Sequence, residues 1–553
     1  MRLFVERLKQ RNFKFQNTNI FLVVRLLLLV VLLVGIFDSC GFSARSSTDM
    51  RAFFPKEALI YLESDNLGKT LQGLTESEAF KRYSSTARDF SVINGLQFAV
   101  GIVGFATNEK RVTSEQSIIN LKPQFVVVAE THAWNWQINS LVENNLNGFV
   151  RGIYGDDSKL ETSDRDGEKW FTWTAKDGRK TFAAISGTQI FFSNNEKALN
   201  QCLDAKKGKV EDLRKLQSLA IEREKEKGKI AFGFISNAGV KSVADLVGVS
   251  IALEKSEDEN ARGLISRILP QILKNTTKHI AWFAHKREKG IEDRVVIKTS
   301  KEISDVLSET IVSSNPRNKD LFTFVPPEAF SVTRYDLKKP QIAFRSLLLV
   351  VAKNVDPITG KFLGVLSNSL LESYGIANAE AFLALVKSEM ISVTLDEDED
   401  KSFAVIKTKD LEKLKRTISK GIHFHEMPTK RYGADVWESQ DKTLAVAVVE
   451  NVMLLGDLRS VYESLSYANK KGDRPKNSLF AKMNESNAAA ATTEINIKGH
   501  EKIVRVLGRV KTNLAGKTSR ISTETYFNKT GIERRYISDF GFIGTILEQF
   551  ATE

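Results

Sequence analysis

KTFAAISGTQIFFSNNEKAL at Lys180–Leu199 and KTLAVAVVENVMLLGDLRSV at Lys442–Val461 are two versions of one pattern, 262 residues apart. In the first version, two apolar runs enclose a short turn and lead to Asn194-Asn195, after which apolar residues recur at helical spacing. Such a pattern predicts two paired strands followed by a helix. Because it occurs twice, it also predicts that the chain folds as a repeated unit.

Three further matches lie in the same order along the chain. They pair FPKEALIYLESD at Phe54–Asp65 with VPPEAFSVTRYD at Val325–Asp336, Ser218-Leu219 with Ser478-Leu479, and Gly290–Glu292 with Gly531–Glu533. Their offsets are 271, 260 and 241 residues; a steady fall is what a duplication with deletions in its second copy would leave. We therefore predict two tandem related modules, residues 52–312 and 321–551, joined by the polar linker SSNPRNKD at residues 313–320.

The pattern within each module predicts an α+β fold. Lys176-Asp177-Gly178-Arg179 separates two apolar runs with a hairpin turn signal, and Glu288-Lys289-Gly290 separates another pair. Consecutive hairpins punctuated by helices favour mostly antiparallel sheets, and we expect the helices to pack on one face of each sheet. A doubly wound parallel sheet needs regular alternation of strands and helices, which fits the pattern less well.

The N-terminal segment has the pattern of an export signal. Residues 1–19 carry five basic side chains against one acid, and Ile20–Phe37 (residues 20–37) is apolar apart from Arg25 and one glycine. The run that starts at Leu26 has the length of a signal-peptide core. The whole stretch would form a transmembrane helix preceding the modules if Arg25 snorkels to the cytoplasmic headgroups. In either case the positive-inside rule places the rest of the chain outside the cytoplasm.

Three fates of this segment stay open. The preferred one is an uncleaved inner-membrane anchor with a short cytoplasmic tail, followed by a linker at residues 38–51. The alternatives are cleavage among the small residues of 39–44, which gives a secreted protein, and lipid modification of Cys40. The position of Cys40, just past the apolar run, resembles a bacterial lipobox, but Asp38 departs from the small residues of that motif.

Composition and charge narrow the classes of function. Ample apolar content and only two cysteines exclude a collagen-like, disulfide-stapled or wholly disordered chain. Residues 1–44 hold six basic and two acidic side chains, so +4 of the net charge of +12 belongs to the export signal. The remaining excess is diluted over about five hundred residues, and we expect no nucleic-acid partner.

Several segments together resemble the exported bacterial proteins grouped as domain of unknown function 3352. They are FPKEALIYLES with the following NLGKTLQGLTESEAF, the segment SLAIEREKEKGKIAFGFIS, and the apolar leader. The resemblance covers most of the chain after residue 50. It implies a membrane-anchored or secreted protein with a duplicated α+β module, and it brings no known catalytic residues.

His423 and His425 are the two histidines that lie close together in the sequence. In GIHFHE they alternate with Phe424, so a strand would place both rings on one face, at a spacing suited to a divalent metal. No third ligand is identifiable nearby, and a surface strand with two solvated histidines is favoured. The acidic run Asp396–Asp400 predicts a solvated hairpin tip, and Cys202 predicts a buried thiol.

Trp134 and Trp136 lie in AETHAWNWQINSL, at a predicted turn from strand to helix. Positions i and i+2 of a helix diverge, so at most one indole is expected to be buried with Ile138 and Leu141. Packing of both at the turn is the simpler arrangement. An exposed indole would be a recognition residue for a peptide or a glycan.

Catalytic motifs fail on inspection. Gly68-Lys69-Thr70 has the tail of a phosphate loop, but Glu63 stands where the first glycine is required, and Asp539-Phe540-Gly541 lacks the other kinase motifs. We expect a non-enzymatic binding or scaffolding protein of the bacterial cell envelope, without a cofactor. Its partners would be the bilayer and an unknown envelope protein, peptide or glycan, held in a cleft between the modules. The alternative is an envelope hydrolase whose carboxylates, or His423 and His425, meet only in the fold.

Overall fold

The computed structural model describes residues 47–548, apart from 112–116, 256–258, 314–318, 398–400, 419–423, 471–477, 497–499, 512–518 and parts of 358–375. The leader, with Ile20, Arg25, Leu26, Phe37 and Cys40, lies outside the described residues. The first half of the structure is residues 47–313, and the second half is residues 319–548.

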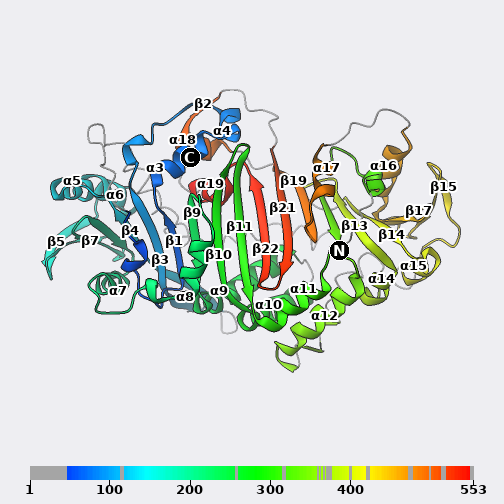
Figure 1. Ribbon diagram of the computed structural model, residues 1–553, viewed down its shortest axis with the longest axis horizontal. Coiled ribbons are helices and arrows are strands. Elements are labelled where there is room, and N and C mark those ends of the chain that lie inside the picture. The colour runs from blue at the N-terminus through cyan, green and yellow to red at the C-terminus, as the bar shows by residue number, and fades with distance from the viewer. Residues whose placement is uncertain are drawn as a thin grey trace.

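One antiparallel sheet runs through both halves (Figure 1). In the first half the strands lie in the order β5 (Lys159–Arg165), β6 (Glu168–Thr174), β7 (Lys180–Ser186), β8 (Gln189–Ser193), β4 (Ser117–Glu130), β3 (Gln97–Arg111), β1 (Ile60–Ser64), β9 (Ala231–Ile235), β10 (Thr277–Arg287) and β11 (Gly290–Thr299). In the second half they continue as β22 (Gly531–Ser538), β21 (Ser519–Asn528), β19 (Ala490–Asn496), β12 (Ser331–Asp336), β13 (Val386–Thr394), β14 (Ser402–Thr408), β18 (Val452–Asp457), β17 (Leu444–Val449), β16 (Ala434–Glu438) and β15 (Thr429–Arg431). The α+β class with antiparallel pairing is therefore confirmed.

The order of the strands is the same in the two halves when each is followed from its outer end, β5 or β15, toward the middle. The strands β11 and β22 meet there and pair antiparallel, so the halves share one sheet at the place where a cleft between modules was expected. Arg294 lies directly opposite Arg535, and these two residues are related by the 241-residue offset of the matched Gly-Ile-Glu motifs. The junction is thus symmetric about this arginine pair.

Glycine begins both junction strands for a steric reason. Gly290 and Gly531 have φ values of 159° and 135°. A Cβ atom at Gly290 would lie 2.3 Å from the carbonyl oxygen of Ser538, and one at Gly531 would lie 2.1 Å from that of Ile297. Any larger residue would push the two strands apart, which explains why the Gly-Ile-Glu motif occurs at the same place in both halves.

Helices cover both faces of the sheet, so the expectation of helices on one face is wrong. Consecutive residues of β4 show this directly, because Val127 and Ala129 belong to one apolar cluster, whereas Val126 and Val128 belong to another. The first cluster contains α3 (Leu67–Thr75), α4 (Glu78–Tyr83), α5 (Asn135–Ser140), the π-helical turn η4 (Leu141–Leu146) and α6 (Asn147–Tyr154). The second contains η2 (Met50–Phe53), α7 (Glu196–Lys206), η5 (Leu213–Lys215) and α8 (Gln217–Lys225). A run of apolar residues without alternation is what burial on both faces requires.

The second half is covered in the same way. One cluster packs α14 (Ala379–Leu385) and α15 (Leu411–Ile418) on the sheet, and the cluster on the other face packs η6 (Lys319–Phe324), α16 (Leu458–Asn469) and α17 (Ser478–Glu485). Outside these clusters, α9 (Asn237–Lys255) and α10 (Glu259–Thr276) pack against each other. They connect β9 to β10 in the chain.

The two halves also exchange helices. From the second half, α18 (Glu501–Leu507) and α19 (Gly541–Glu548) complete the first half's core beside α3 and α4. From the first half, α11 (Lys301–Thr310) packs on β21 and β22, and with α12 (Pro340–Lys353) it forms a separate cluster. A small sheet adds to this exchange by pairing β2 (Ser84–Ala87) with β20 (Gly508–Val510). In the view of Figure 1, α4 and α18 lie above the sheet strands, and α11 and α12 lie below them.

Described residues at the ends of both predicted linkers already take part in the fold. Within the predicted linker 38–51, Thr48 is hydrogen bonded to Gln97 and Met50 is fully buried, so folded structure begins by residue 48. At the second linker, Ser313 donates a hydrogen bond to Asp336, and the helix η6 already starts at Lys319. Apolar side chains next to both segments explain this, since Met50 packs in the core of the first half and Leu321 in that of the second.

Candidate functional site

Of the histidine pair, only His425 lies among the residues that the structure describes. His423 lies outside the described residues, and His425 is exposed beside β16, where its backbone N–H donates to Glu438. Among the described residues, no cluster of three or more His, Cys, Asp or Glu side chains is placed to hold a metal ion. In that part of the chain, no helix has both the length and the apolar character needed to cross a bilayer.

Cys202 and the acidic run have plain structural positions. Cys202 is a fully buried residue of α7, and burial raises the pKa of its thiol far above the ordinary value, so the prediction of a buried thiol is confirmed. Asp396 follows β13 and forms an ion pair with Lys401, which precedes β14. These residues lie at the predicted hairpin tip, of which residues 398–400 lie outside the described chain.

Trp134 and Trp136 are both exposed, by 70% and 68%, so the expectation that they pack at the turn is wrong. The reason lies in the local backbone. His132 has a left-handed φ of 50°, and its N–H donates to the Glu130 carboxylate. At the start of α5, the Trp134 N–H donates to the Gln137 side chain. The residues Thr131–Gln137, here called the tryptophan corner, therefore turn both indoles outward.

A buried polar cluster lies beneath the tryptophan corner. Glu130, 1% exposed, accepts hydrogen bonds from Gln189, and Lys206 of α7 donates to Gln189 and to the hydroxyl and carbonyl of Ser186. Burial lowers the pKa of Lys206, as a catalytic lysine would require. Its three protons already have acceptors, however, so the cluster fixes α7 to the strand ends and leaves no donor for a substrate.

A serine, a histidine and an aspartate also gather under α4. The Nε2 atom of His500 lies 3.2 Å from Asp539 and 3.3 Å from the Ser519 hydroxyl, and Arg82 and Tyr83 complete the group. A catalytic triad uses the two different ring nitrogens for the acid and the nucleophile. Here one nitrogen faces both, and the three side chains are buried, so this cluster joins α4 to the second half rather than activating the serine.

The junction between the halves carries a charged strip on one face of the sheet. Glu533, 9% exposed, accepts hydrogen bonds of 2.7 Å from both Arg294 and Arg535. Arg294 also donates to Glu226, which follows α8. Burial would raise the pKa of Glu533, but the two guanidinium groups outweigh it and hold the pKa below its usual value. This junction strip, defined as Glu226, Arg294, Glu533 and Arg535, links the halves by charge.

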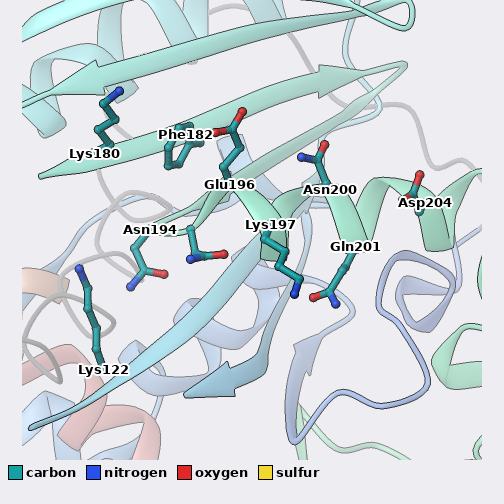
Figure 2. A pocket seen from close by; sticks show the side chains of 10 residues that line it. Lys122, Lys180, Phe182, Asn194, Glu196, Lys197, Asn200, Gln201 and Asp204 are labelled. Carbon is teal, nitrogen blue, oxygen red and sulfur yellow. The ribbon is translucent and has the colours of Figure 1, made fainter. Parts of the chain in front are cut away.

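Two surface pockets open on the outer sides of α7 and α16. The pocket on α7 has a volume of about 750 Å³, and lysines from three elements are among the residues that line it (Figure 2). It is lined by Lys122, Lys180, Phe182, Asn194, Asn195, Glu196, Lys197, Asn200, Gln201 and Asp204. Its lining is polar and lacks a serine, cysteine or histidine nucleophile.

The pocket on α16 is different in character and is here called the tyrosine pocket. It has a volume of about 340 Å³ and is lined by Glu328, Tyr432, Tyr462, Glu463, Ser466, Tyr467 and Lys470. The two pockets use equivalent helix positions, because Asn200, Gln201 and Asp204 become Tyr462, Glu463 and Ser466 at the 262-residue offset. At one of these positions the second half has the aromatic ring of Tyr462 where the first half has the amide of Asn200.

The tyrosine rings are held in place by the surrounding strands. Tyr462 donates a hydrogen bond to Glu438 of β16, and the Arg431 guanidinium lies 5.6 Å from the centre of its ring. Burial and the neighbouring Glu438 raise the pKa of Tyr462, so it stays a neutral phenol. Tyr432, at the turn between β15 and β16, has a φ of 49° and is half exposed at the pocket. The pocket can thus bind a ligand through ring faces and carboxylates.

Sequence reasoning missed the tyrosine pocket. Its walls come from residues near 328, 432 and 462, which the paired strands bring together, and the one signal available was the pair Tyr462 and Tyr467 on a helix of the second module. A scan of protein-family models and searches of curated proteins and of solved structures find no match to the chain. The resemblance to the domain of unknown function 3352 proteins therefore stays a prediction.

Proposed function

We propose that this chain is a membrane-anchored, extracytoplasmic protein that binds a partner of the bacterial cell envelope without catalysing a reaction. The anchor is the apolar segment Ile20–Phe37, with the bulk of the chain in the periplasm or outside the cell; secretion and a lipoprotein with lipid on Cys40 are the alternatives. The support is the basic flank before the apolar run and its positive-inside asymmetry.

The same proposal describes residues 52–312 and 321–551 as two related modules that arose by duplication, following an N-terminal hydrophobic helix. Three features support it: the matched sequence blocks, the repeated strand order, and the symmetric pairing of β11 with β22 about Arg294 and Arg535. Because the modules share one sheet and exchange helices, they form a single stiff body. A stiff body suits a protein that holds a partner at a fixed place, since little ordering entropy is then lost on binding.

The observation that carries the binding function is the tyrosine pocket. Three phenol rings and two carboxylates, those of Glu328 and Glu463, line one space together with the ammonium of Lys470, and the Arg431 guanidinium lies near one ring, that of Tyr462. Ring faces attract cations, and carboxylates form strong hydrogen bonds with guanidinium and ammonium groups. The pocket therefore fits a lysine or arginine side chain of an envelope protein or peptide.

Site-specific cross-linking tests this proposal. We expect a photoreactive phenylalanine analogue in place of Tyr467, in the full chain made in cells, to yield a cross-linked envelope protein. The adduct should be lost when Glu463→Gln and Tyr432→Ala are added, because these changes remove a carboxylate and a ring without touching the sheet. The same analogue at the exposed turn residue Asp177 is the control, and an adduct that survives both pocket changes would contradict the proposal.

The hydrolase alternative has its own test. The purified full chain would be screened against ester, peptide and glycan substrates, with and without zinc. The binding proposal expects no turnover above background. Reproducible turnover that is abolished by His423→Ala would replace it with the envelope hydrolase.

A further inference from the structure

The two exposed indoles of the tryptophan corner are an unusual feature of a protein surface. Tryptophan carries the largest apolar side chain, and two largely exposed ones close in sequence leave a substantial apolar area in water. No ring contact holds Trp134 or Trp136 among the described residues, whereas Trp170 and Trp173 are buried in the core. Their solvent exposure indicates a surface that another body covers.

The corner is rigid enough to present the indoles in a fixed direction. The Ala133 N–H donates to the Thr131 hydroxyl, and the Trp134 N–H donates to Gln137. Below it, Ile138 is fully buried and fixes α5 to the sheet. Little conformational entropy remains for the backbone to lose when the indoles are covered.

The chain that follows the leader enters the fold at the same corner. The buried side chain of Gln97 accepts a hydrogen bond from the Thr48 N–H at 2.8 Å and donates to the Thr48 carbonyl, also at 2.8 Å. The Nε2 atom of His132 lies 3.3 Å from the same Gln97 oxygen. Trp134 is only two residues further on, so the entry point and the indoles share one small region of the surface.

The length of the intervening chain limits how far this region can be from the apolar segment. Residues 38–46 join Phe37 to Ser47. Ten Cα-to-Cα steps extend to about 35 Å at most, whatever the conformation of the segment. If Ile20–Phe37 crosses the bilayer, the tryptophan corner is the part of the folded body that is held next to it.

We propose that Trp134 and Trp136 insert into the headgroup region of the bilayer that holds the N-terminal anchor. Tryptophan favours this region because its ring is apolar and its N–H still finds a partner there. The neighbouring side chains Asn135, Gln137 and Asn139 are neutral, so the contact requires no anionic lipid. The inference rests on the proposed anchor and adds the orientation of the folded body.

This contact directs the rest of the protein away from the membrane. The helix α5 lies at one end of the long axis of the molecule, and α16, which carries the tyrosine pocket, lies at the other (Figure 1). With the tryptophan corner on the bilayer, the sheet becomes an arm that presents the pocket to the envelope space.

Fluorescence quenching by the lipid tests the insertion. The full chain would be reconstituted in phosphatidylcholine vesicles with or without brominated acyl chains, which quench nearby indoles. We expect the brominated lipid to remove about one third of the emission, because two of the six tryptophans would contact it. The double variant Trp134→Phe, Trp136→Phe should lose this quenching, whereas Trp437→Phe, at a half-buried position in the second half, should keep it.

Flotation of the same vesicles distinguishes a failure of the proposed anchor from a failure of the proposed indole insertion. If the chain floats with the vesicles but its emission is quenched no more than that of the double variant, the insertion is refuted and the anchor stands. If the chain does not float, the anchor fails and the insertion fails with it. If brominated lipid does not quench the indoles but soluble glycan fragments of the envelope change their emission, the insertion is overturned in favour of a glycan site.

Discussion

The charged strip at the junction offers the sharpest test of the shared sheet. Glu533→Gln keeps the shape of the side chain but removes the charge that Arg294 and Arg535 share. A charge-assisted hydrogen bond contributes about 1.5–3 kcal/mol, and the contribution of the more exposed Arg535 is reduced by solvent. We therefore expect the free energy of unfolding to fall by about 2 kcal/mol.

Urea unfolding followed at two tryptophans measures this effect. Trp282 reports on the first half and Trp437 on the second. Because the sheet is continuous and helices are exchanged, Glu533→Gln should lower both midpoints equally. The same change at the exposed edge residue Glu161 should change the free energy of unfolding by less than about 0.5 kcal/mol.

The pH dependence provides an internal check on the same variant. The pKa of Glu533 is lowered in the folded protein, so its contribution is complete above the ordinary carboxyl pKa and is lost as the pH falls through the folded value. The difference between wild type and Glu533→Gln should therefore vanish in acid. Two separate transitions, with only the Trp437 midpoint shifted, would refute the idea of one cooperative body.

Three further predictions concern buried groups. Burial raises the pKa of Asp293 to about 6, so the folded state binds its proton more tightly than the unfolded chain does, and stability falls as the pH rises from about 4 to 6. The unfolding free energy of wild type minus that of Asp293→Asn should fall by about 2 kcal/mol over this range; a constant difference would argue against it. In a Cys40→Ser background, Cys202 should react with a maleimide only after denaturation, and fast labelling of the native chain would show that α7 opens. A Cβ atom at Gly101 would lie 2.4 Å from the Phe54 ring, so Gly101→Ala should cost about 1–3 kcal/mol, and Phe54→Leu should recover part of this loss if the clash is the cause.

Local sequence patterns predicted much of the secondary structure. The turn at Lys176-Asp177-Gly178-Arg179 lies between β6 and β7 as predicted, and the turn at Glu288-Lys289-Gly290 joins β10 to β11. The wrong prediction that helices pack on one face of the sheet was partly avoidable. Four consecutive apolar residues at Val126–Ala129 already indicate a strand that is buried on both faces. Which strands pair across the chain, such as β4 with β8 or β11 with β22, depends on contacts between distant segments and left no local signal.

The candidate sites show where such reasoning stops. The outward direction of Trp134 depends on the left-handed backbone at His132 and on one side-chain cap, and neither has a sequence signature. The tyrosine pocket needs Glu328, Tyr432 and Tyr462, which lie more than 100 residues apart at their extremes and meet only when the second half has folded. The matched blocks did predict that α7 and α16 would be equivalent helices.

The most direct test of a membrane-anchored binding protein is to treat spheroplasts with protease and analyse what remains in the membrane. The account predicts that the exposed body, from about residue 47 onward, is degraded, while a fragment that begins at Met1 and contains Ile20–Phe37 stays in the bilayer. A soluble chain that begins near residue 45, with no such fragment in the membrane, would contradict it.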